Sequence, residues 1–280
     1  IRELYYQLKH TIPGLNENTL ENQDESNPVI VDLETALDSL REHLHLIAEP
    51  KGRLFGPITI EDEGDQIDCL KLGKSGLGVP SMVDDYKFVE HSADYVLVCE
   101  TSAMAARLVE EDFHKKENAI IVSAGGQPSR GVRRLTNILH KRLDLPVYVF
   151  TDGDPYGYYI YSVLTAGSMN LAFESNRLAT PDANLIGMTM SDIEEYGLQN
   201  VTEKLKGKHP DKSGGPTKDY KRATDMLKYE WFQNKEWEKE LNTMIEKGVR
   251  VEQQALATNN LQFVAETYLP EKIEKGDFLP

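Results

Sequence analysis

The sequence has little of what marks secreted, membrane or zinc-binding proteins. Its 280 residues include only two cysteines, Cys69 and Cys99, which are distant from each other and form no C-x-x-C pair. A disulfide framework and a cysteine zinc site are therefore both excluded. No apolar run approaches the roughly 20 residues that cross a bilayer, and no basic segment followed by an apolar stretch marks a signal peptide. The composition predicts a soluble protein of a reducing cytoplasm with no membrane partner.

Basic residues are also in the minority. Lys and Arg total 31 against 46 Asp and Glu, which gives a formal charge of -15. Because affinity for nucleic acids comes largely from Lys and Arg that neutralise phosphates, this total taken alone argues against a nucleic-acid binder. Positive charge nevertheless gathers in two stretches, residues 130–142 and 204–222. Such runs are usually solvated surface, so the charge leaves the partner undecided.

The first part of the chain has the pattern of helices followed by a hairpin. Helical patterns cover residues 1–12 and 31–46, and short strand signals separated by Gly and Pro follow over residues 54–72. Helices followed by a hairpin are the outline of a winged helix. The chain opens inside the first helical pattern without a methionine, so we expect this domain, residues 1–75, to be incomplete at its N-terminus.

The pattern changes within residues 73–92. Continuous apolar runs of strand length then alternate with helical stretches, and these runs are Tyr95–Cys99, Ala119–Val122, Pro146–Phe150 and Ala183–Gly187. Strands that are apolar on both faces and alternate with helices indicate a covered, mostly parallel sheet. A helical tail follows over residues 221–247. We therefore predict α/β plus α+β architecture, with a Rossmann-like parallel-sheet domain and a helical C-terminal extension over residues 76–280.

Carboxylates follow two of the predicted strands. Glu100 follows the first run, and Asp152 and Asp154 follow the third in the sequence T-D-G-D-P-Y-G. Chemistry in an open parallel sheet collects beyond the carboxyl ends of its strands, so we expect these acids to meet. Clustered carboxylates repel one another unless a cation lies between them, and oxygen ligands without His or Cys select Mg²⁺ or Mn²⁺. The sequence thus predicts a divalent-metal site.

This combination resembles a Toprim domain, the metal-binding module of topoisomerases and primases. The resemblance covers roughly residues 92–187 and depends on Glu100, Gly125-Gly126 and the Asp152-Gly-Asp154 motif. An alternative is a phosphotransferase of the haloacid-dehalogenase type, in which the first Asp of a D-x-D is the nucleophile. In that class a Thr or Val usually follows closely, whereas here the motif is followed by Pro155 and Tyr156.

The first helical pattern presents two adjacent tyrosines to opposite sides. On a helical wheel, Leu4, Tyr5 and Leu8 share an apolar arc, so Tyr5 should anchor the helix to its core. Tyr6 lies nearly opposite and shares its face with Arg2, one turn earlier. An exposed tyrosine is commonly only a surface residue, but beside a metal site it is a candidate nucleophile.

The segment Arg-Glu-Leu-Tyr-Tyr at residues 2–6 resembles the catalytic motif of a known family. That family contains the cleavage component of DNA topoisomerase VI, its A subunit, together with the related meiotic transesterase that makes double-strand breaks. The likeness continues through residues 52–57, Gly167-Ser168 and residues 268–272, and its ending is more similar to the archaeal topoisomerase. It implies a CAP-like winged helix, Tyr6 as nucleophile with Arg2 as its companion, and a metal held by the acids named above.

The resemblance also implies a reaction and partners. Tyr6 would attack a DNA backbone phosphate, form a 5′-phosphotyrosyl link and relax or decatenate duplex DNA, with Tyr6 of one protomer facing the acids of the other. The chain has no phosphate-binding loop, so ATP would act only through a GHKL-type B subunit in an A2B2 heterotetramer. We expect DNA along Arg130, Arg133 and Arg134, in a nucleoid-associated cytoplasmic complex. A catalytically silent DNA-binding or scaffold relative is the competing interpretation.

Overall fold

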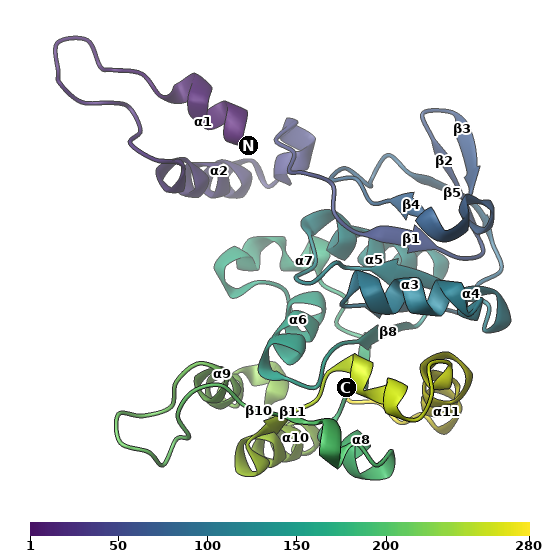
Figure 1. Ribbon diagram of the computed structural model, residues 1–280. Helices are drawn as coiled ribbons and strands as arrows, with labels where there is room; N and C mark the ends of the chain where they lie inside the picture. The colour runs from purple at the N-terminus through teal and green to yellow at the C-terminus, as the bar shows by residue number, and fades with distance from the viewer.

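A helical arm formed by the first residues lies at one end of the molecule (Figure 1). The computed structural model describes residues 1–280, except for the side chains of residues 169–171. In the arm, α1 (Arg2–Leu8) packs on α2 (Gln23–Leu37), and the short η1 (Arg41–Leu44) follows. The second helix starts and ends earlier than the sequence pattern predicts. The Asn22 side chain caps its first turn, and Asp38 ends it in a left-handed conformation.

A small antiparallel sheet follows the arm. It contains β2 (Ile58–Asp62), β3 (Asp65–Asp68) and β5 (Lys87–His91) in the order β3-β2-β5. The β2–β3 hairpin turns through Glu63 and Gly64, both with positive φ, as a two-residue turn requires when it matches the twist of the strands. The predicted hairpin is therefore present, whereas the winged-helix interpretation of residues 1–75 stays a prediction.

The central sheet has six strands in the order β4-β1-β7-β6-β8-β9. Its four parallel strands are those that the apolar runs predict, namely β6 (Tyr95–Cys99), β7 (Ala119–Ser123), β8 (Val147–Phe150) and β9 (Asn184–Gly187). Helices cover both faces, with α3 on one side of the strands and α5 on the other (Figure 1). The helices that follow the parallel strands are α3 (Ser102–Glu110), α4 (Phe113–Lys116), α5 (Arg130–Leu143) and α6 (Pro155–Thr165).

Two short strands also join this sheet. One lies before residue 76, where the parallel-sheet domain is predicted to begin, and the other lies just after it. β1 (Arg53–Phe55) pairs antiparallel with β7 and with β4 (Leu77–Gly78). The backbone approaches closely here, because a Cβ on Gly52 would lie 2.8 Å from the Ser123 carbonyl oxygen. Strands from both sides of residue 75 therefore belong to one sheet, and the division of the chain at that residue stays a prediction. The strand signal that begins at Leu54 corresponds to β1, but no local pattern indicates that this strand pairs with β7.

The C-terminal part covers the other end of the sheet with short elements. Its helices are α8 (Met190–Glu195), α9 (Asp219–Met226), α10 (Lys235–Lys247), η6 (Gln253–Thr258), the π-helical turn η7 (Val264–Tyr268) and α11 (Leu269–Lys275). β10 (Glu203–Lys204) pairs with β11 (Val249–Arg250). The remaining helical turns are η2 (Cys69–Ser75), η3 (Met169–Glu174), α7 (Ser175–Leu178), η4 (Gln199–Val201) and η5 (Glu230–Phe232). No helix in the described part of the chain is both long and apolar enough to cross a membrane.

Candidate active site

Glu100 and Asp152 lie side by side at the carboxyl edge of the central sheet. Their strands, β6 and β8, are parallel neighbours with Cys99 opposite Phe150, so the residues that follow them emerge together. The backbone N–H of Asp152 donates a hydrogen bond to Glu100 Oε2 at 3.0 Å. The end of β7 reaches the same place, because the Gly126 N–H donates to the Glu100 carbonyl oxygen at 2.7 Å. The ends of neighbouring strands thus bring Glu100 and Asp152 together, as expected from the sequence.

Both carboxylates are hard to ionise in this position. Burial raises the pKa of Glu100 to about 7, and the charge of Asp152 adds to the effect. Burial likewise raises the pKa of Asp152 to about 6, with the charges of Asp154 and Glu252 adding to it and the Gln253 N–H at 2.8 Å opposing it. Desolvated carboxylates of this kind favour either a proton or a cation.

One oxygen on each of these two acids has no hydrogen-bond donor among the described residues. Glu100 Oε2 accepts from Asp152 and Asp152 Oδ1 accepts from Gln253, which leaves Glu100 Oε1 and Asp152 Oδ2. Two carboxylate oxygens without protein donors, in a place without His or Cys ligands, fit a hard divalent cation. Glu100 and Asp152 are therefore the residues able to hold Mg²⁺ or Mn²⁺.

Asp154, the third acid of the predicted metal set, differs from Glu100 and Asp152 because both of its oxygens have protein partners. Its Oδ1 accepts hydrogen bonds from the N–H groups of Tyr156 and Gly157, at 2.8 and 2.7 Å, and so caps α6. Its Oδ2 lies 3.4 Å from the Arg250 guanidinium. Because both oxygens already have partners within the protein, Asp154 acts as a helix cap and as the carboxylate partner of Arg250.

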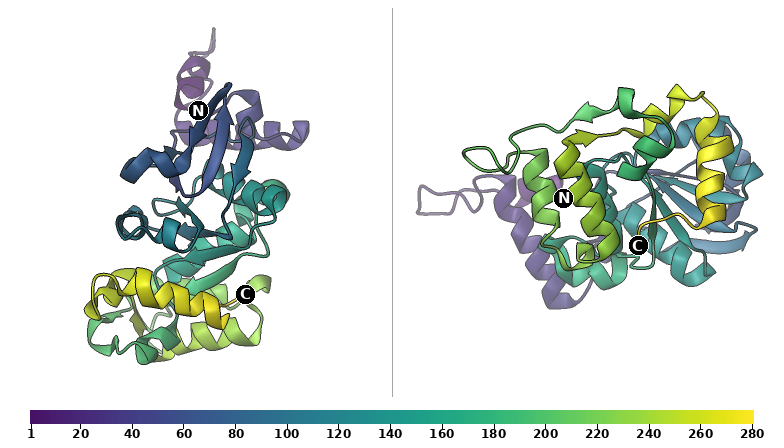
Figure 2. Two further views of the ribbon diagram at one scale, coloured as in Figure 1. Left: turned by 90° about the vertical axis from the view of Figure 1, so that its right-hand side faces the viewer. Right: turned by 90° about the horizontal axis from the view of Figure 1, so that it is seen from below.

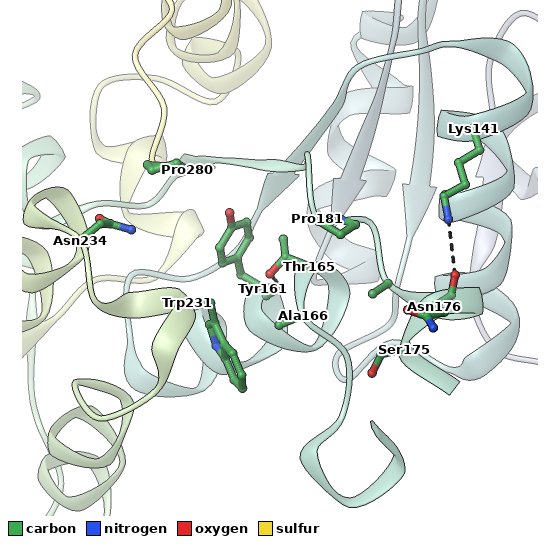
Figure 3. A pocket seen from close by; sticks show the side chains of 11 residues that line it. Lys141, Tyr161, Thr165, Ala166, Ser175, Asn176, Pro181, Trp231, Asn234 and Pro280 are labelled. Carbon is green, nitrogen blue, oxygen red and sulfur yellow. Dashed lines mark hydrogen bonds between the residues drawn. The ribbon is translucent and has the colours of Figure 1, made fainter. Parts of the chain in front are cut away.

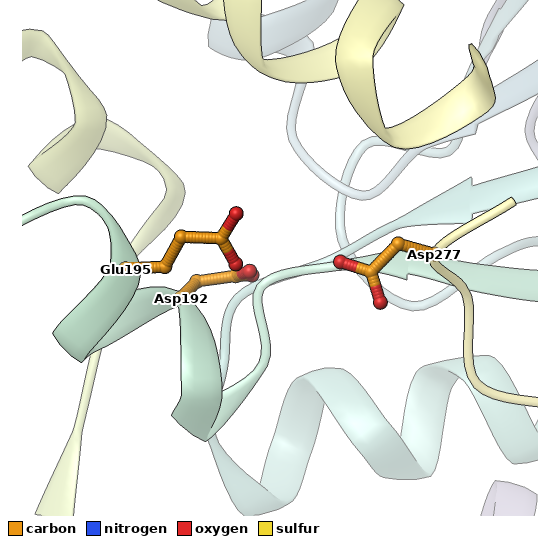
Figure 4. Close-up of side chains that lie close together, drawn as sticks. All are labelled: Asp192, Glu195 and Asp277. Atoms are coloured by element: carbon orange, nitrogen blue, oxygen red, sulfur yellow. The ribbon is translucent and has the colours of Figure 1, made fainter. Parts of the chain in front are cut away.

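A different trio of acids gathers more tightly, near the C-terminus. Asp192, Glu195 and Asp277 each offer an oxygen within 4.8 Å of the others (Figure 4). However, the buried Lys272 ammonium lies 2.6 Å from Asp192 Oδ1 and 2.6 Å from Asp277 Oδ2. Tyr268 also donates to Asp192 at 2.6 Å. A lysine already supplies the positive charge here, so this trio stabilises the C-terminal helices rather than forming a metal site.

Three residues of the acidic edge come from far downstream and were not found by sequence reasoning. Arg250, Glu252 and Gln253 reach the edge because the backbones of Gly153 and Val251 pair, with N–H to oxygen distances of 2.8 and 3.1 Å. The segment V-R-V-E-Q-Q carries no motif. No signal in a single sequence indicates that β11 lies beside the D-x-D turn.

The tyrosine pair has the orientation that the helical wheel predicts. Tyr5 is 8% exposed and its hydroxyl donates to the Glu21 carbonyl oxygen at 3.0 Å, whereas Tyr6 is 73% exposed. Leu8 is only half-buried, so Tyr5 carries most of the anchoring. Arg2 lines an open groove between α1, the start of α2 and residues 47–50. Figure 1 and the left view of Figure 2 show α1 at one end of the molecule, apart from the sheet and from α6. The first residue of α6, Pro155, follows the D-x-D turn.

The three arginines expected to contact DNA face carboxylates of the same chain. Arg130 pairs with Glu34 at 2.6 Å, with Glu42 at 2.8 Å and with Glu174. Arg133 is buried and pairs with Glu174, and Arg134 pairs with Asp84. Arg130 thus joins the helical arm to α5, and the acids that cover all three arginines do not favour the expected contact with DNA. The sequence showed the basic helix face but not the acids that cover it.

One cavity lies away from the acids. It has a volume of about 510 Å³ and is lined by the end of α6 opposite Asp154, by α7 and by residues near Trp231 (Figure 3). Lys141 at its rim donates to the Asn176 carbonyl oxygen at 3.4 Å. None of the residues predicted for the site lines this cavity, so it is separate from the acidic edge.

Parallel strands that end in Glu100 and in the D-x-D turn, with helices on both faces, define a Toprim-type domain. Comparison with known families agrees: residues 95–273 match the family described as the Toprim domain of the topoisomerase 6 A subunit/Spo11. Residues 49–92 match "All-beta domain in DNA topoisomerase VI alpha subunit", and residues 1–46 match "Type IIB DNA topoisomerase".

Archaeal relatives extend this similarity over the whole chain. The A subunit of type 2 DNA topoisomerase 6 from Pyrococcus abyssi is 57% identical over 280 residues, which is all of this chain and 73% of the relative. The protein of the same name from Pyrococcus horikoshii is 56% identical over the same shares. That of Methanocaldococcus jannaschii is 43% identical over 289 residues, all of this chain and 74% of the relative. The chain belongs to the family of topoisomerase VI A subunits, which are type IIB DNA topoisomerases.

Proposed function

We propose that this chain cleaves and reseals duplex DNA by transesterification, with Tyr6 as the nucleophile. The Tyr6 oxygen attacks a backbone phosphorus, the bond from phosphorus to the 3′ oxygen breaks, and a 5′-phosphotyrosyl link forms. The phenol proton is released and the leaving oxygen becomes a 3′-hydroxyl, so the reverse reaction reseals the strand without a further energy source. The observation that carries the proposal is the exposed Tyr6 phenol on a helix whose other tyrosine is buried.

The acidic edge supplies the second half of the site. Glu100 and Asp152 would hold Mg²⁺, with Mn²⁺ as a substitute, through the two oxygens that lack protein donors. When bound, such an ion stabilises negative charge on the attacked phosphate and the leaving oxygen. Asp154, the third acid of the motif, keeps the start of α6 and Arg250 in place beside them. Arg2 would steady the attacked phosphate one helical turn from Tyr6.

The complete site would form between two chains. Since α1 lies apart from α6, the helix that Asp154 caps, Tyr6 would act on a phosphate held at the acids of a second protomer (Figure 1). A homodimer then contains two such sites, one for each strand of the duplex. Strand passage would need ATP through a GHKL-type B subunit in an A2B2 complex. We place this complex on chromosomal DNA in the cytoplasm, as a nucleoid-associated enzyme.

The proposal is tested by trapping the covalent intermediate. Purified chain, an archaeal B subunit, ATP and Mg²⁺ are incubated with supercoiled plasmid, and detergent is added to denature the protein on the DNA. Protein should remain attached to 5′ ends. Tyr6→Phe should abolish the attachment, and the matched variant Tyr5→Phe should retain it. An adduct that persists in Tyr6→Phe would show that the nucleophile is another residue.

A further inference from the structure

Unpaired positive charge gathers along the segment that runs from β10 into α9. We call this the basic loop surface, and it comprises Lys204, Lys206, Lys208, Lys212, Lys218 and Arg222. The five lysines are exposed, and none of the six cations lies within ion-pair distance of a carboxylate among the described residues. By contrast, Arg130, Arg133 and Arg134 of α5 are paired with acids. In a chain with a net charge of -15, this is a local reversal of sign.

The loop is a built structure that keeps its lysines together. The two sides of the loop are joined by hydrogen bonds. The N–H groups of Lys206 and Lys208 donate to Asp219 Oδ2 at 2.8 Å and to Thr217 Oγ1 at 2.7 Å. Return bonds run from Asp219 N–H to the Lys206 oxygen and from Thr217 N–H to the Lys208 oxygen. Gly207 allows the close approach, because a Cβ there would collide with the Thr217 carbonyl oxygen. Exposed lysines therefore lie on both sides of the loop, with Lys206 and Lys208 on one and Lys218 on the other.

Arg222 is held by aromatic rings instead of by a carboxylate. Its guanidinium lies 4.4 Å from the centre of the Tyr156 ring and 4.6 Å from that of Tyr159. Stacking of this kind stabilises and orients a guanidinium while leaving its N–H groups free to donate at its edge. Tyr156 lies two residues after Asp154, in the first turn of α6, and is 47% exposed. The oriented arginine thus lies against the first turns of α6, the helix that starts at the D-x-D turn.

The loop begins beside the acids. Lys204 lies on β10, which pairs with β11, and β11 leads directly into Val251, the residue that pairs with Gly153 between the two aspartates. Arg250 of β11 also contacts both Glu203 and Asp154. At the other end of the loop, α9 packs on α6. A linear polyanion placed at Glu100 and Asp152 could therefore continue directly onto the basic loop surface.

We propose that the basic loop surface binds the phosphate backbone of the DNA segment held at the acidic edge. A docking site for a protein has an apolar centre, but none of the exposed large apolar side chains lies between residues 204 and 218. Binding of phosphates needs only mobile cations such as these lysines and an oriented arginine. That the ligand is DNA rests on the proposed function. The inference does not depend on Tyr6 being the nucleophile.

The test compares two pairs of lysines that carry the same charge. In the first variant, Lys206→Gln and Lys208→Gln are combined; in the control, Lys235→Gln and Lys239→Gln remove two exposed α10 lysines that also lack carboxylate partners. Binding of a fluorescein-labelled duplex of about 30 base pairs is followed by anisotropy at several NaCl concentrations in EDTA, so that no cleavage contributes. Circular dichroism verifies the fold of each variant.

The loop variant should bind several-fold more weakly at low salt. The slope of log K against log salt should become shallower by up to about 1.8, because each lost phosphate contact removes about 0.9. The control should match the wild type. Equal slopes in all three proteins, or an equal loss in the control, would overturn the proposal. So would a loop variant that binds DNA normally but fails to associate with the B subunit, since the surface would then dock an acidic protein. Failure of the Tyr6 adduct experiment would leave this test unaffected.

Discussion

The Arg250 guanidinium lies 3.4 Å from Asp154 Oδ2, at the edge of the predicted metal site. The same arginine also pairs with Glu203 and lies 4.0 Å from Glu252. It therefore holds a permanent positive charge against the carboxylate that sequence reasoning assigned to the metal. Arg250 therefore neutralises the charge of Asp154, and Glu100 and Asp152 remain available to bind a divalent cation.

Removal of this charge should strengthen metal binding. Without the guanidinium, the acidic edge is more negative and Asp154 Oδ2 loses its partner, so Arg250→Gln should bind Mn²⁺ about threefold to tenfold more tightly. Isothermal titration with Mn²⁺ gives the affinity and the number of ions directly. Arg250→Lys, which keeps the charge, should bind Mn²⁺ as the wild type does.

Variants of the two acidic clusters provide the matched control for that titration. Glu100→Gln should abolish Mn²⁺ binding, and Asp277→Asn should leave it unchanged because Lys272 already neutralises the C-terminal trio. Loss of binding in Asp277→Asn would instead identify that trio as the metal site. Weaker binding in Arg250→Gln would show that the arginine supports the ion.

Glu100 should make the metal-free protein less stable as pH rises. Its pKa is about 7 in the folded chain and near 4.5 ordinarily, so the folded state holds a proton that the unfolded state has released between these values. Stability from this group is therefore lost as pH increases from about 4.5 to about 7. Glu100→Gln removes the penalty and should be more stable than wild type by on the order of 2–3 kcal/mol above pH 7.

Urea unfolding in EDTA at pH 4.5 and pH 7.5 measures this difference. The free energies of unfolding of wild type and Glu100→Gln should agree at the lower pH and diverge at the higher one. Addition of Mg²⁺ at pH 7.5 should stabilise the wild type and not the variant. A difference that is independent of pH would contradict the assignment of a raised pKa to Glu100.

Arg130 should be important for stability. Its guanidinium is surrounded by Glu34, Glu42 and Glu174, whose side chains are almost fully buried. Arg130→Met leaves Glu42 without an ion-pair partner, while Glu34 keeps Arg41 and Glu174 keeps Arg133. The variant should cost about 3–5 kcal/mol, because uncompensated buried charge is strongly unfavourable. The salt dependence of DNA binding should not change. Urea unfolding followed by circular dichroism measures the first quantity, and anisotropy measures the second.

Arg177→Met is the matched control for Arg130→Met. Arg177 also joins the arm to the parallel-sheet domain, but it pairs with the exposed Asp38 at 3.1 Å. Exposed pairs contribute little, so this variant should lose less than about 1 kcal/mol. Equal losses in the two variants would show that burial of the Arg130 network is not the source of its stability. A shallower salt slope in Arg130→Met would restore the arginine as a DNA contact.

Periodicity and strand ends made part of this structure predictable. The four buried parallel strands produce continuous apolar runs, and the rule that chemistry gathers at strand ends brings Glu100 to Asp152. The wheel likewise distinguishes Tyr5 from Tyr6, because a single helical turn fixes their directions. These predictions depend on local geometry that repeats along the chain.

Other features depend on contacts that no local pattern contains. β1 is three residues long and pairs with β7 and with β4, so strands from both sides of residue 75 belong to one sheet. The basic face of α5 looks like a DNA contact until Glu34 and Glu174 are seen to cover it. Arg250 reaches Asp154 only because β11 pairs beside the D-x-D turn. Pairing over long sequence distances decides each of these cases.

The most direct test of the account is to locate the covalent link to DNA in the protein. Complexes trapped by detergent are digested with nuclease and trypsin, which cleaves after Arg2 and Lys9 and releases residues 3–9 with a residual nucleotide attached. Tandem mass spectrometry then distinguishes the two adjacent tyrosines. The account predicts the added mass on Tyr6. A nucleotide on Tyr5, on an acid of the strand ends, or on no residue of this peptide would contradict it.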